Sequence, residues 1–412
     1  MLDMLFKLNH RPTVGVFMPF ISENRGGPDV TAMWLIQSLC TIYQVTLVTT
    51  RQFELLKFNK FAGTSLTRED FRIRVLPSIP TPSHLAMSAL QGPIFQRFAK
   101  RCSRDFDVCI SAMNPLDFGV RGIHFLADLG WLRFFPPSAD GLVEFDRSQP
   151  MSLRNIYHRL CSRLDDRSGR NLLQDDLLVS NSSWVASILS ELAVESQVIF
   201  PPVPIATSAS NWDDRCQDFV WIGRIAPSKR VESAINIIRL VREAGVKCKL
   251  HIVGNALDKE YAASIHKLAQ AVGDWVTLKG PLYGAEKTRY LENFQYALHT
   301  RADEPFGITV AELVKSGCIV FGPNSAGSAE ILGRENLLFS TEREAADKIL
   351  RVIRNPRLIE ESIRHLQERA KCFSTGTFQS SVCRLVAEFL EKNPSALGPD
   401  KRRADDGILT LR

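Results

Sequence analysis

Short apolar runs alternate with longer segments of helical spacing through the first half of the chain. Residues 14–19 predict a buried strand, residues 29–43 a helix with one apolar face, and residues 45–49 the next strand. Further strands are predicted at 71–76, 108–112, 123–126 and 177–181. A helix is expected from Ser182 or Ser183 to about residue 192, before the proline-rich link at 198–203.

The second half repeats this scheme. Strands are predicted at 219–223, 248–253, 276–279, 297–300, 318–322 and 337–339, and helices at 229–244, 258–272, 284–294, 305–316, 356–371 and 375–392. Strands that alternate with helices imply a parallel sheet covered on both faces. Two such series predict an α/β protein of two Rossmann-like domains facing a cleft.

Composition agrees with a soluble globular protein of two or more domains. The chain has 412 residues, with 45% hydrophobic and 23% charged residues. A net charge of +6 is too small to indicate a nucleic-acid partner. The basic cluster formed by Arg97, Lys100, Arg101 and Arg104 predicts either a solvated helix face or a contact with anionic membrane.

The cysteines and the N-terminus indicate the cytoplasm. Nine cysteines include no Cys-x-x-Cys, so we expect reduced, mostly buried thiols, and no Cys/His cluster has zinc-ligand spacing. The first residues lack the apolar core and cleavage site of a signal peptide, and no stretch is long enough to span a membrane. We expect a cytoplasmic protein that remains in solution or lies at the inner face of the membrane.

The segment from Glu304 to Glu312 carries the most specific chemistry. Its Pro305-Phe306-Gly307 turn opens an apolar-periodic run, which predicts a helix N-terminus with free N–H groups suited to a phosphate. Glu312, on the first turns of that helix, can accept hydrogen bonds from a pair of ribose hydroxyls.

A second candidate lies where the strand at 219–223 ends, in Gly223-Arg224 with Lys229 following. Two cations there form either a solvated surface turn or a clamp for a diphosphate. No Gly-Lys-Ser/Thr follows residues 324–327, and no Gly-x-Gly-x-x-Gly occurs in the chain, which argues against a P-loop and against a dinucleotide dehydrogenase.

These blocks resemble a known family. Glu304-x7-Glu312 with Phe-Gly inside is similar to the signature of the retaining, GT-B-fold glycosyltransferases of family 4. The blocks at 219–230, 249–254 and 317–330 are similar to the strand, Gly-Arg…Lys and glycine-loop segments of that family, in the same order.

The resemblance implies an organisation and an activity. It implies an acceptor-binding domain at 1–205, a nucleotide-sugar-binding domain at 206–374, a helix at 375–393 that returns to the N-terminal domain, and a flexible tail at 394–412. The implied activity is metal-independent hexosyl transfer with retention, from a nucleotide-sugar to a saccharide or lipid-linked acceptor. This places the protein in polysaccharide or glycoconjugate synthesis, with no cofactor.

The resemblance also implies the site. Arg224, Lys229 and Glu304 would act on the diphosphate and the transferred sugar. The donor would further contact Gly26, Gly27, Leu282, Phe306, Gly307, Ile308, Thr309 and Glu312. Gly26 and Gly27 follow the first strand, where open α/β sheets place ligands, although an ordinary turn is the alternative.

Acceptor-side candidates are His124 and Asp128, in a region with some likeness to the dolichol-pathway α-1,2-mannosyltransferases. A histidine that this subgroup has three residues beyond the position of His124 is absent, since the chain has Ala127-Asp128 there. A core histidine and a turn-capping aspartate are the alternatives.

Two other functions stay open. One is a different GT-B enzyme, a nucleotide-sugar epimerase or a phosphorylase-like protein, and the other is a non-catalytic nucleotide-sugar-binding protein.

Overall fold

The computed structural model describes residues 11–21, 26–76, 88–134, 172–205, 208, 211–256 and 258–393. The chain forms two compact units. Unit 1 comprises Met1–Asn181, Val185–Ile199 and Phe378–Arg412, and unit 2 comprises Ser182–Trp184 and Phe200–Thr377. The tail expected at 394–412 lies outside the described residues.

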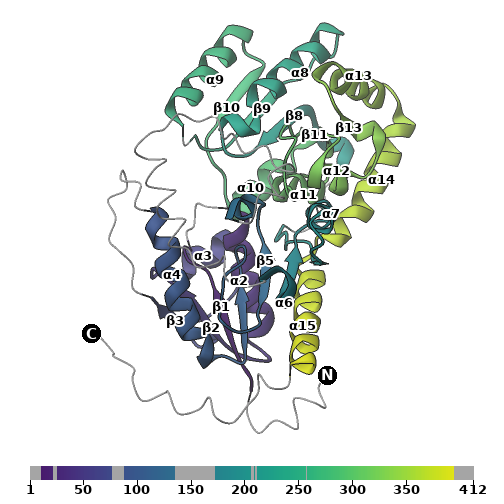
Figure 1. Ribbon diagram of the computed structural model, residues 1–412. Helices are drawn as coiled ribbons and strands as arrows, with labels where there is room; N and C mark the ends of the chain where they lie inside the picture. The colour runs from purple at the N-terminus through teal and green to yellow at the C-terminus, as the bar shows by residue number, and fades with distance from the viewer. Residues whose placement is uncertain are drawn as a thin grey trace. The chain divides into compact units, whose positions relative to one another are not determined.

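Unit 1 is built on a parallel sheet with the strand order β3-β2-β1-β4-β5-β6-β7. Strands β1, β2, β3 and β5 of this sheet are labelled in Figure 1. Its strands are β1 (Thr13–Phe17), β2 (Gln44–Thr49), β3 (Phe71–Val75), β4 (Val108–Ser111), β5 (Ile123–Leu126), β6 (Leu177–Ser180) and β7 (Gln197–Val198). The helices of this part are α2 (Gly27–Leu39), α3 (Leu55–Ala62), α4 (Ser88–Cys102), α6 (Leu172–Asp175), α7 (Ser183–Glu191) and α15 (Thr375–Lys392), with 3-10 turns η1 (Ser103–Asp105) and η2 (Gly130–Phe134).

Both faces of this sheet are covered by helices. Val14 and Val16 of β1 belong to a buried cluster that also contains residues of α2, α3 and α15. Phe17, one position further along, belongs to a second cluster with Phe95 and Ala99 of α4. Because successive side chains of a strand point to opposite faces, the two clusters lie on opposite sides of the sheet.

Unit 2 is built on a second parallel sheet, ordered β10-β9-β8-β11-β12-β13. Its strands are β8 (Cys216–Ile222), β9 (Leu250–Val253), β10 (Val276–Lys279), β11 (Phe294–Leu298), β12 (Ile319–Pro323) and β13 (Leu338–Phe339). The helices are α8 (Val231–Glu243), α9 (Lys259–Val272), α10 (Gly284–Leu291), α11 (Ile308–Lys315), α12 (Ala326–Leu332), α13 (Glu342–Ile353) and α14 (Pro356–Cys372), with 3-10 turns η5 (Trp212–Asp214), η6 (Pro227–Lys229) and η7 (Glu335–Leu337).

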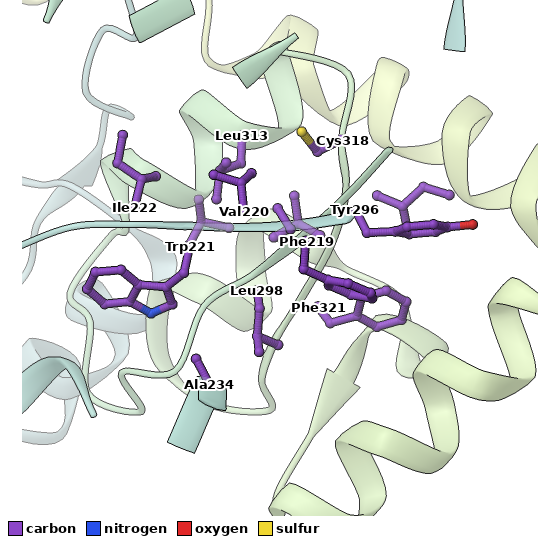
Figure 2. Packing of buried hydrophobic residues seen from close by; sticks show 14 of the residues in the cluster. Phe219, Val220, Trp221, Ile222, Ala234, Tyr296, Leu298, Leu313, Cys318 and Phe321 are labelled. Carbon is purple, nitrogen blue, oxygen red and sulfur yellow. The ribbon is translucent and has the colours of Figure 1, made fainter. Parts of the chain in front are cut away.

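Strand β8 shows the same alternation in the core of unit 2. In Figure 2, Trp221 points toward the side of Ala234 on α8, and its neighbour Val220 points to the opposite side, toward Leu313 on α11. All four side chains are buried. The sheet is therefore held between α8 and α11, and the loops that follow its strands carry the candidate site.

The parallel sheets and their covering helices confirm the two Rossmann-like domains predicted from the sequence. From Phe378 onward α15 belongs to unit 1, where Val382 and Phe389 join the core. The predicted return of the C-terminal helix is thus confirmed as well.

Some predicted bounds are wrong. The helix expected at 305–316 begins at Ile308, because Gly307 before it has left-handed backbone angles that no helix continues through. The helix expected at 29–43 ends at Leu39. The sequence patterns also did not predict α3, α12 and α13.

The described cysteines are free, as expected, but most are not buried. Cys109, Cys248 and Cys318 are buried, Cys216 is exposed, and the remaining four described cysteines are half-buried. Among the residues that the structure describes, no helix is long and apolar enough to cross a membrane.

Candidate active site

The turn before α11 has the geometry that the sequence predicts for a helix N-terminus. Gly307 is the residue before the first turn of the helix, with φ 98° and ψ 59°. Left-handed angles cost an L-residue about 1–2 kcal/mol, so glycine suits this position. The first N–H groups of a helix have no acceptor within it, which leaves those of Ile308 and Thr309 directed at the turn.

Glycine 327 holds this turn from the side of α12. Its N–H donates to the carbonyl oxygen of Glu304 at 2.9 Å. A Cβ on Gly327 would lie 2.4 Å from the carbonyl oxygen of Phe306, a distance at which the backbone would have to move. The hydroxyl of Ser182 donates to the Pro305 carbonyl at 2.6 Å. Residues 304–306 are therefore fixed by backbone contacts.

Lys229 and Glu304 form an ion pair at the centre of the site, with their side chains only 12% and 14% exposed. The backbone of Lys229 is held as well, because its carbonyl accepts from the Thr300 hydroxyl at 2.7 Å and Trp221 donates to that hydroxyl at 3.0 Å. The structure thus brings together two residues that the sequence placed in separate motifs.

Positive charge exceeds negative charge around this pair. Burial lowers the pKa of Lys229, and the nearby Arg301 and Arg224 lower it further, while Glu304 opposes them. Burial would raise the pKa of Glu304, but Lys229, Arg301 and His299 outweigh that effect, so the pKa of this carboxyl lies below its usual value. A site with excess positive charge attracts an anion.

Two of these neighbours were not predicted from the sequence. Arg301 Nη1 lies 3.7 Å from Glu304 Oε1, and Arg301 also pairs with Asp303 at 2.9 Å. His299 Nε2 lies 3.9 Å from Glu304 Oε2. Their position at the carboxyl end of the central strand β11, where parallel sheets place ligands, was the signal available in the sequence.

Arg224 lies after β8 and is exposed. It makes no hydrogen bond or ion pair with any residue that the structure describes, although its charge reaches Lys229. Its guanidinium is therefore available to an incoming ligand.

Glu312 lies on α11 and is buried, with Oε1 2.6 Å from the ammonium of Lys287 on α10. The sequence did not identify Lys287 as part of the site. On the same helix, Lys315 is buried and donates to the Val203 carbonyl at 2.6 Å, and burial lowers the pKa of Lys315 to about 8. Of the remaining candidates here, Phe306 is buried in the core, and Leu282, Ile308 and Thr309 are half-buried.

The glycine candidates of unit 1 begin α2. Gly26 precedes the helix with φ 118°, and Gly27 is its first residue. A Cβ on Gly26 would meet none of the described residues within 4 Å.

His124 lies inside the core of unit 1, where its ring is packed and hydrogen-bonded. It is fully buried, Nδ1 accepts a hydrogen bond from the Leu116 N–H at 3.4 Å, and Nε2 faces Asp176 Oδ2 at 3.2 Å. The ring also stacks on Phe118. Both ring nitrogens have partners, which favours the core-histidine alternative.

Asp128 is exposed and caps the turn that follows it. Its Oδ1 accepts from the Gly130 N–H at 2.8 Å and from the Asn114 amide at 3.2 Å. Asn114 in turn holds the backbone N–H of Ala127 at 2.9 Å. Because Asp128 is exposed, its carboxylate can cap this turn and also meet an acceptor hydroxyl.

Within the described residues, no group of three or more His, Cys, Asp or Glu side chains is placed to hold a metal ion.

Part of the chain is similar to known proteins. Residues 206–372 match the family model for Glycosyl transferases group 1. A GDP-Man:Man(3)GlcNAc(2)-PP-Dol alpha-1,2-mannosyltransferase of Xenopus tropicalis is 25% identical over 167 residues, which cover 37% of this chain and 34% of that protein. A tRNA-queuosine alpha-mannosyltransferase of Drosophila melanogaster is 23% identical over 219 residues, covering 50% of this chain and 56% of that protein. The chain thus spans about a third to a half of the length of these relatives.

Among solved structures, HepE of Anabaena in complex with UDP-glucose superposes with a TM-score of 0.64 at 14% identity, over 92% of this chain and all of that one. This likeness confirms the GT-B fold expected from the sequence. The charged site around Lys229 and Glu304 lies within residues 206–372, the segment that matches the Glycosyl transferases group 1 model.

Proposed function

We propose that this protein is a retaining glycosyltransferase of family 4 that moves a hexose from a nucleotide-sugar to a saccharide or lipid-linked acceptor. The observation that carries the proposal is the excess positive charge of Lys229, Arg224 and Arg301 around Glu304, beside the N-terminus of α11. In this proposal residues 206–374 bind the donor and residues 1–205 bind the acceptor.

The proposed chemistry follows from where charge develops. Cleavage of the bond between sugar and diphosphate leaves an extra negative charge on the leaving group. Lys229, Arg224 and the N–H groups of Ile308 and Thr309 stabilise that charge without requiring a metal or another cofactor. Glu304 contacts the transferred sugar and keeps Lys229 in place until the diphosphate binds.

The ribose of the donor is assigned to Glu312. Lys287 holds this carboxylate in the free protein, so ribose hydroxyls must share or replace that ammonium as partners. The base lies near Leu282 and is recognised through the backbone. Gly26 and Gly27, at the start of α2, are proposed to approach the donor phosphates from the N-terminal domain.

A panel of nucleoside diphosphates tests the donor site. GDP, UDP and ADP are added in turn to the protein, and the melting temperature is followed. One of them should stabilise the fold by about 2.7 kcal/mol at a hundredfold excess over its Kd. If none shifts the melting temperature, residues 206–374 do not bind a nucleotide.

Transfer is tested next with the matching nucleotide-sugar and a panel of saccharide and lipid-linked acceptors. NMR of the product reads its anomeric configuration, and retention is expected. Sugar isomerisation without acceptor would indicate an epimerase, dependence on inorganic phosphate would indicate a phosphorylase-like enzyme, and binding without turnover would indicate a binding protein. Transfer to tRNA would indicate an acceptor of the class named for the Drosophila relative. It would also contradict the expectation that the protein has no nucleic-acid partner.

We further propose that the protein works in the cytoplasm and contacts the inner face of the membrane through Arg97, Lys100, Arg101 and Arg104. These cations of α4 and η1 line one hollow. Lys100 also pairs with the buried Asp117 at 2.8 Å, which fixes one of the four charges. Juxtaposed basic residues attract anionic lipid by roughly 1 kcal/mol each.

Vesicle co-sedimentation tests the membrane contact. The protein should sediment with vesicles that contain phosphatidylglycerol and remain in solution with phosphatidylcholine alone. Arg97→Glu with Arg104→Glu should abolish sedimentation, whereas Arg68→Glu at an exposed position elsewhere should not. Equal behaviour of the two variants would place the contact on another surface.

A further inference from the structure

His299 has an unpartnered nitrogen beside the ion pair of the candidate site. Its side chain is 3% exposed, and Nε2 has no hydrogen-bond partner among the residues that the structure describes. The backbone of His299 is held in the sheet, because its N–H donates to the Phe321 carbonyl at 2.9 Å. The ring therefore stays beside the ion pair. Leaving a buried polar atom without a hydrogen bond costs roughly 1–3 kcal/mol. A use for this nitrogen in another state of the protein would explain why it is kept.

The geometry identifies what that use is. Nε2 of His299 lies 3.9 Å from Glu304 Oε2, and the ammonium of Lys229 holds that same oxygen. A separation of 3.9 Å is beyond a hydrogen bond but within reach of a small rotation of either side chain. Lys229 therefore occupies the place on Glu304 that His299 could take.

The protonation state of the ring fixes how His299 could do so. The backbone of Arg301 favours the protonated form of the ring, whereas burial favours the neutral form. In the neutral ring one nitrogen carries a hydrogen and the other presents a lone pair, whereas in the protonated ring both nitrogens donate. Only the protonated ring offers Glu304 a cation that donates through Nε2, so replacing the Lys229 ammonium requires the ring to gain one proton.

We propose that His299 is a positioning residue that replaces Lys229 as the partner of Glu304 when a donor diphosphate is bound. The inference rests on the proposed function, in which the diphosphate draws the Lys229 ammonium away. Glu304, still buried, then needs another cation. His299 takes one proton from water onto Nε2 and donates it in a hydrogen bond to Glu304 Oε2. The carboxylate stays ionised and in place, and each donor bound is accompanied by uptake of one proton.

The charges around the ring favour this exchange only in the complex. Glu304 on the loop after β11 favours the protonated ring, whereas Lys229 on η6 and Arg301 oppose it. In the free protein burial and these cations keep the ring neutral, with its pKa lowered to about 4. A bound diphosphate neutralises the same cations, so the balance shifts toward the charged ring.

Calorimetry measures the proton directly. UDP and GDP are titrated into the full-length protein near pH 7 in Pipes and in Tris, which differ in ionisation enthalpy, and the difference in heat gives the number of protons taken up. The comparison protein is His299→Gln, whose amide can reach Glu304 as a neutral donor. Protons that the nucleotide itself exchanges are common to both proteins and cancel.

For each nucleotide bound, the wild type should take up more protons than His299→Gln, by as much as one. The affinities of the two proteins for the nucleotide should stay within about threefold of each other. Equal proton counts with intact binding would overturn the role of His299 and leave the proposed function standing. Absence of binding by either nucleotide to the wild type would instead overturn the proposed function and this inference with it. If His299→Gln does not fold, Glu304→Gln is used in its place, since it too should lose the extra proton.

Discussion

Gly327 donates its backbone N–H to the carbonyl oxygen of Glu304 at 2.9 Å, and the backbone of Pro305 and Phe306 lies where its Cβ would be. The contact links the start of α12 to the turn that opens α11. It places Glu304, and through it Lys229, at a fixed position relative to the N-terminus of α11. The geometry of the charged site therefore depends on a glycine that makes no contact through a side chain.

Replacing that glycine should disturb the site. In Gly327→Ala the new Cβ would lie 2.4 Å from the Phe306 carbonyl oxygen, so the turn must move. We expect destabilisation of about 1–3 kcal/mol, a melting temperature lower by several degrees and weaker nucleotide binding. Gly376→Ala is the matched control, because a Cβ there meets nothing within 4 Å. Equal melting temperatures for the two variants would contradict the close contact.

Removing the Lys229 ammonium should slow transfer far more than it weakens the fold. Lys229→Ala deletes a cation proposed to stabilise the leaving diphosphate, so kcat/KM should fall by an amount equivalent to about 2–4 kcal/mol. Steady-state kinetics with the matching nucleotide-sugar measures this. Lys267→Ala, at an exposed position of α9, should leave kcat/KM unchanged. An unaffected Lys229→Ala enzyme would remove this lysine from the site.

The sequence predicts the frame of this site better than its contacts. Periodicity places β8 and indicates β11 and α11, although the strand predicted at 297–300 starts at Phe294 and the helix predicted at 305–316 starts at Ile308. The spacing from Glu304 to Glu312 singles out the turn at Gly307. The sequence did not predict the partners of these two carboxylates. Lys287 meets Glu312 across 25 positions of sequence, and His299 meets Glu304 only because β11 ends beside the turn. Such pairs depend on how helices and strands pack, which no local pattern encodes.

Transfer should persist when divalent metal is removed. The proposal assigns the charge of the leaving diphosphate to Lys229, Arg224 and the N-terminus of α11, so no step depends on a metal ion. Product formation is measured after dialysis against EDTA, with and without added Mg²⁺ or Mn²⁺. Activity that disappears in EDTA and returns with either ion would refute the charge clamp.

Stability should depend on pH through His299 in the free protein. Burial lowers the pKa of this ring to about 4, whereas the unfolded ring has its ordinary value of 6.5. Between these values the unfolded state binds the extra proton, so the free energy of unfolding falls as pH decreases from 6.5 to 4. The loss attributable to the ring is at most about 1.4 kcal/mol per unit of pKa difference.

Urea unfolding of the wild type and His299→Gln at several pH values isolates this contribution. Carboxylates other than Glu304, whose pKa His299 lowers, affect both proteins alike, so the difference between the proteins reports on the ring and its interaction with Glu304. As the pH falls from 6.5 to 4, the wild type should lose more of its free energy of unfolding than His299→Gln does. A constant difference would show that His299 has the same pKa in both states.

The assignment of Glu312 to the donor ribose has the most selective test. Its carboxylate is buried and already bound to Lys287 at 2.6 Å, so a ribose with two hydroxyls must compete with that ammonium. Glu312→Gln keeps the size and one acceptor but loses the charge. A charge-assisted hydrogen bond contributes about 1.5–3 kcal/mol, so nucleotide affinity should fall.

The wild type should prefer a ribonucleoside diphosphate to its 2′-deoxy form, and Glu312→Gln should lose most of that preference. Glu260→Gln, at an exposed position of α9, should keep it. If Glu312→Gln discriminates between the two sugars as well as the wild type does, its carboxylate serves only to hold Lys287 and the ribose binds elsewhere.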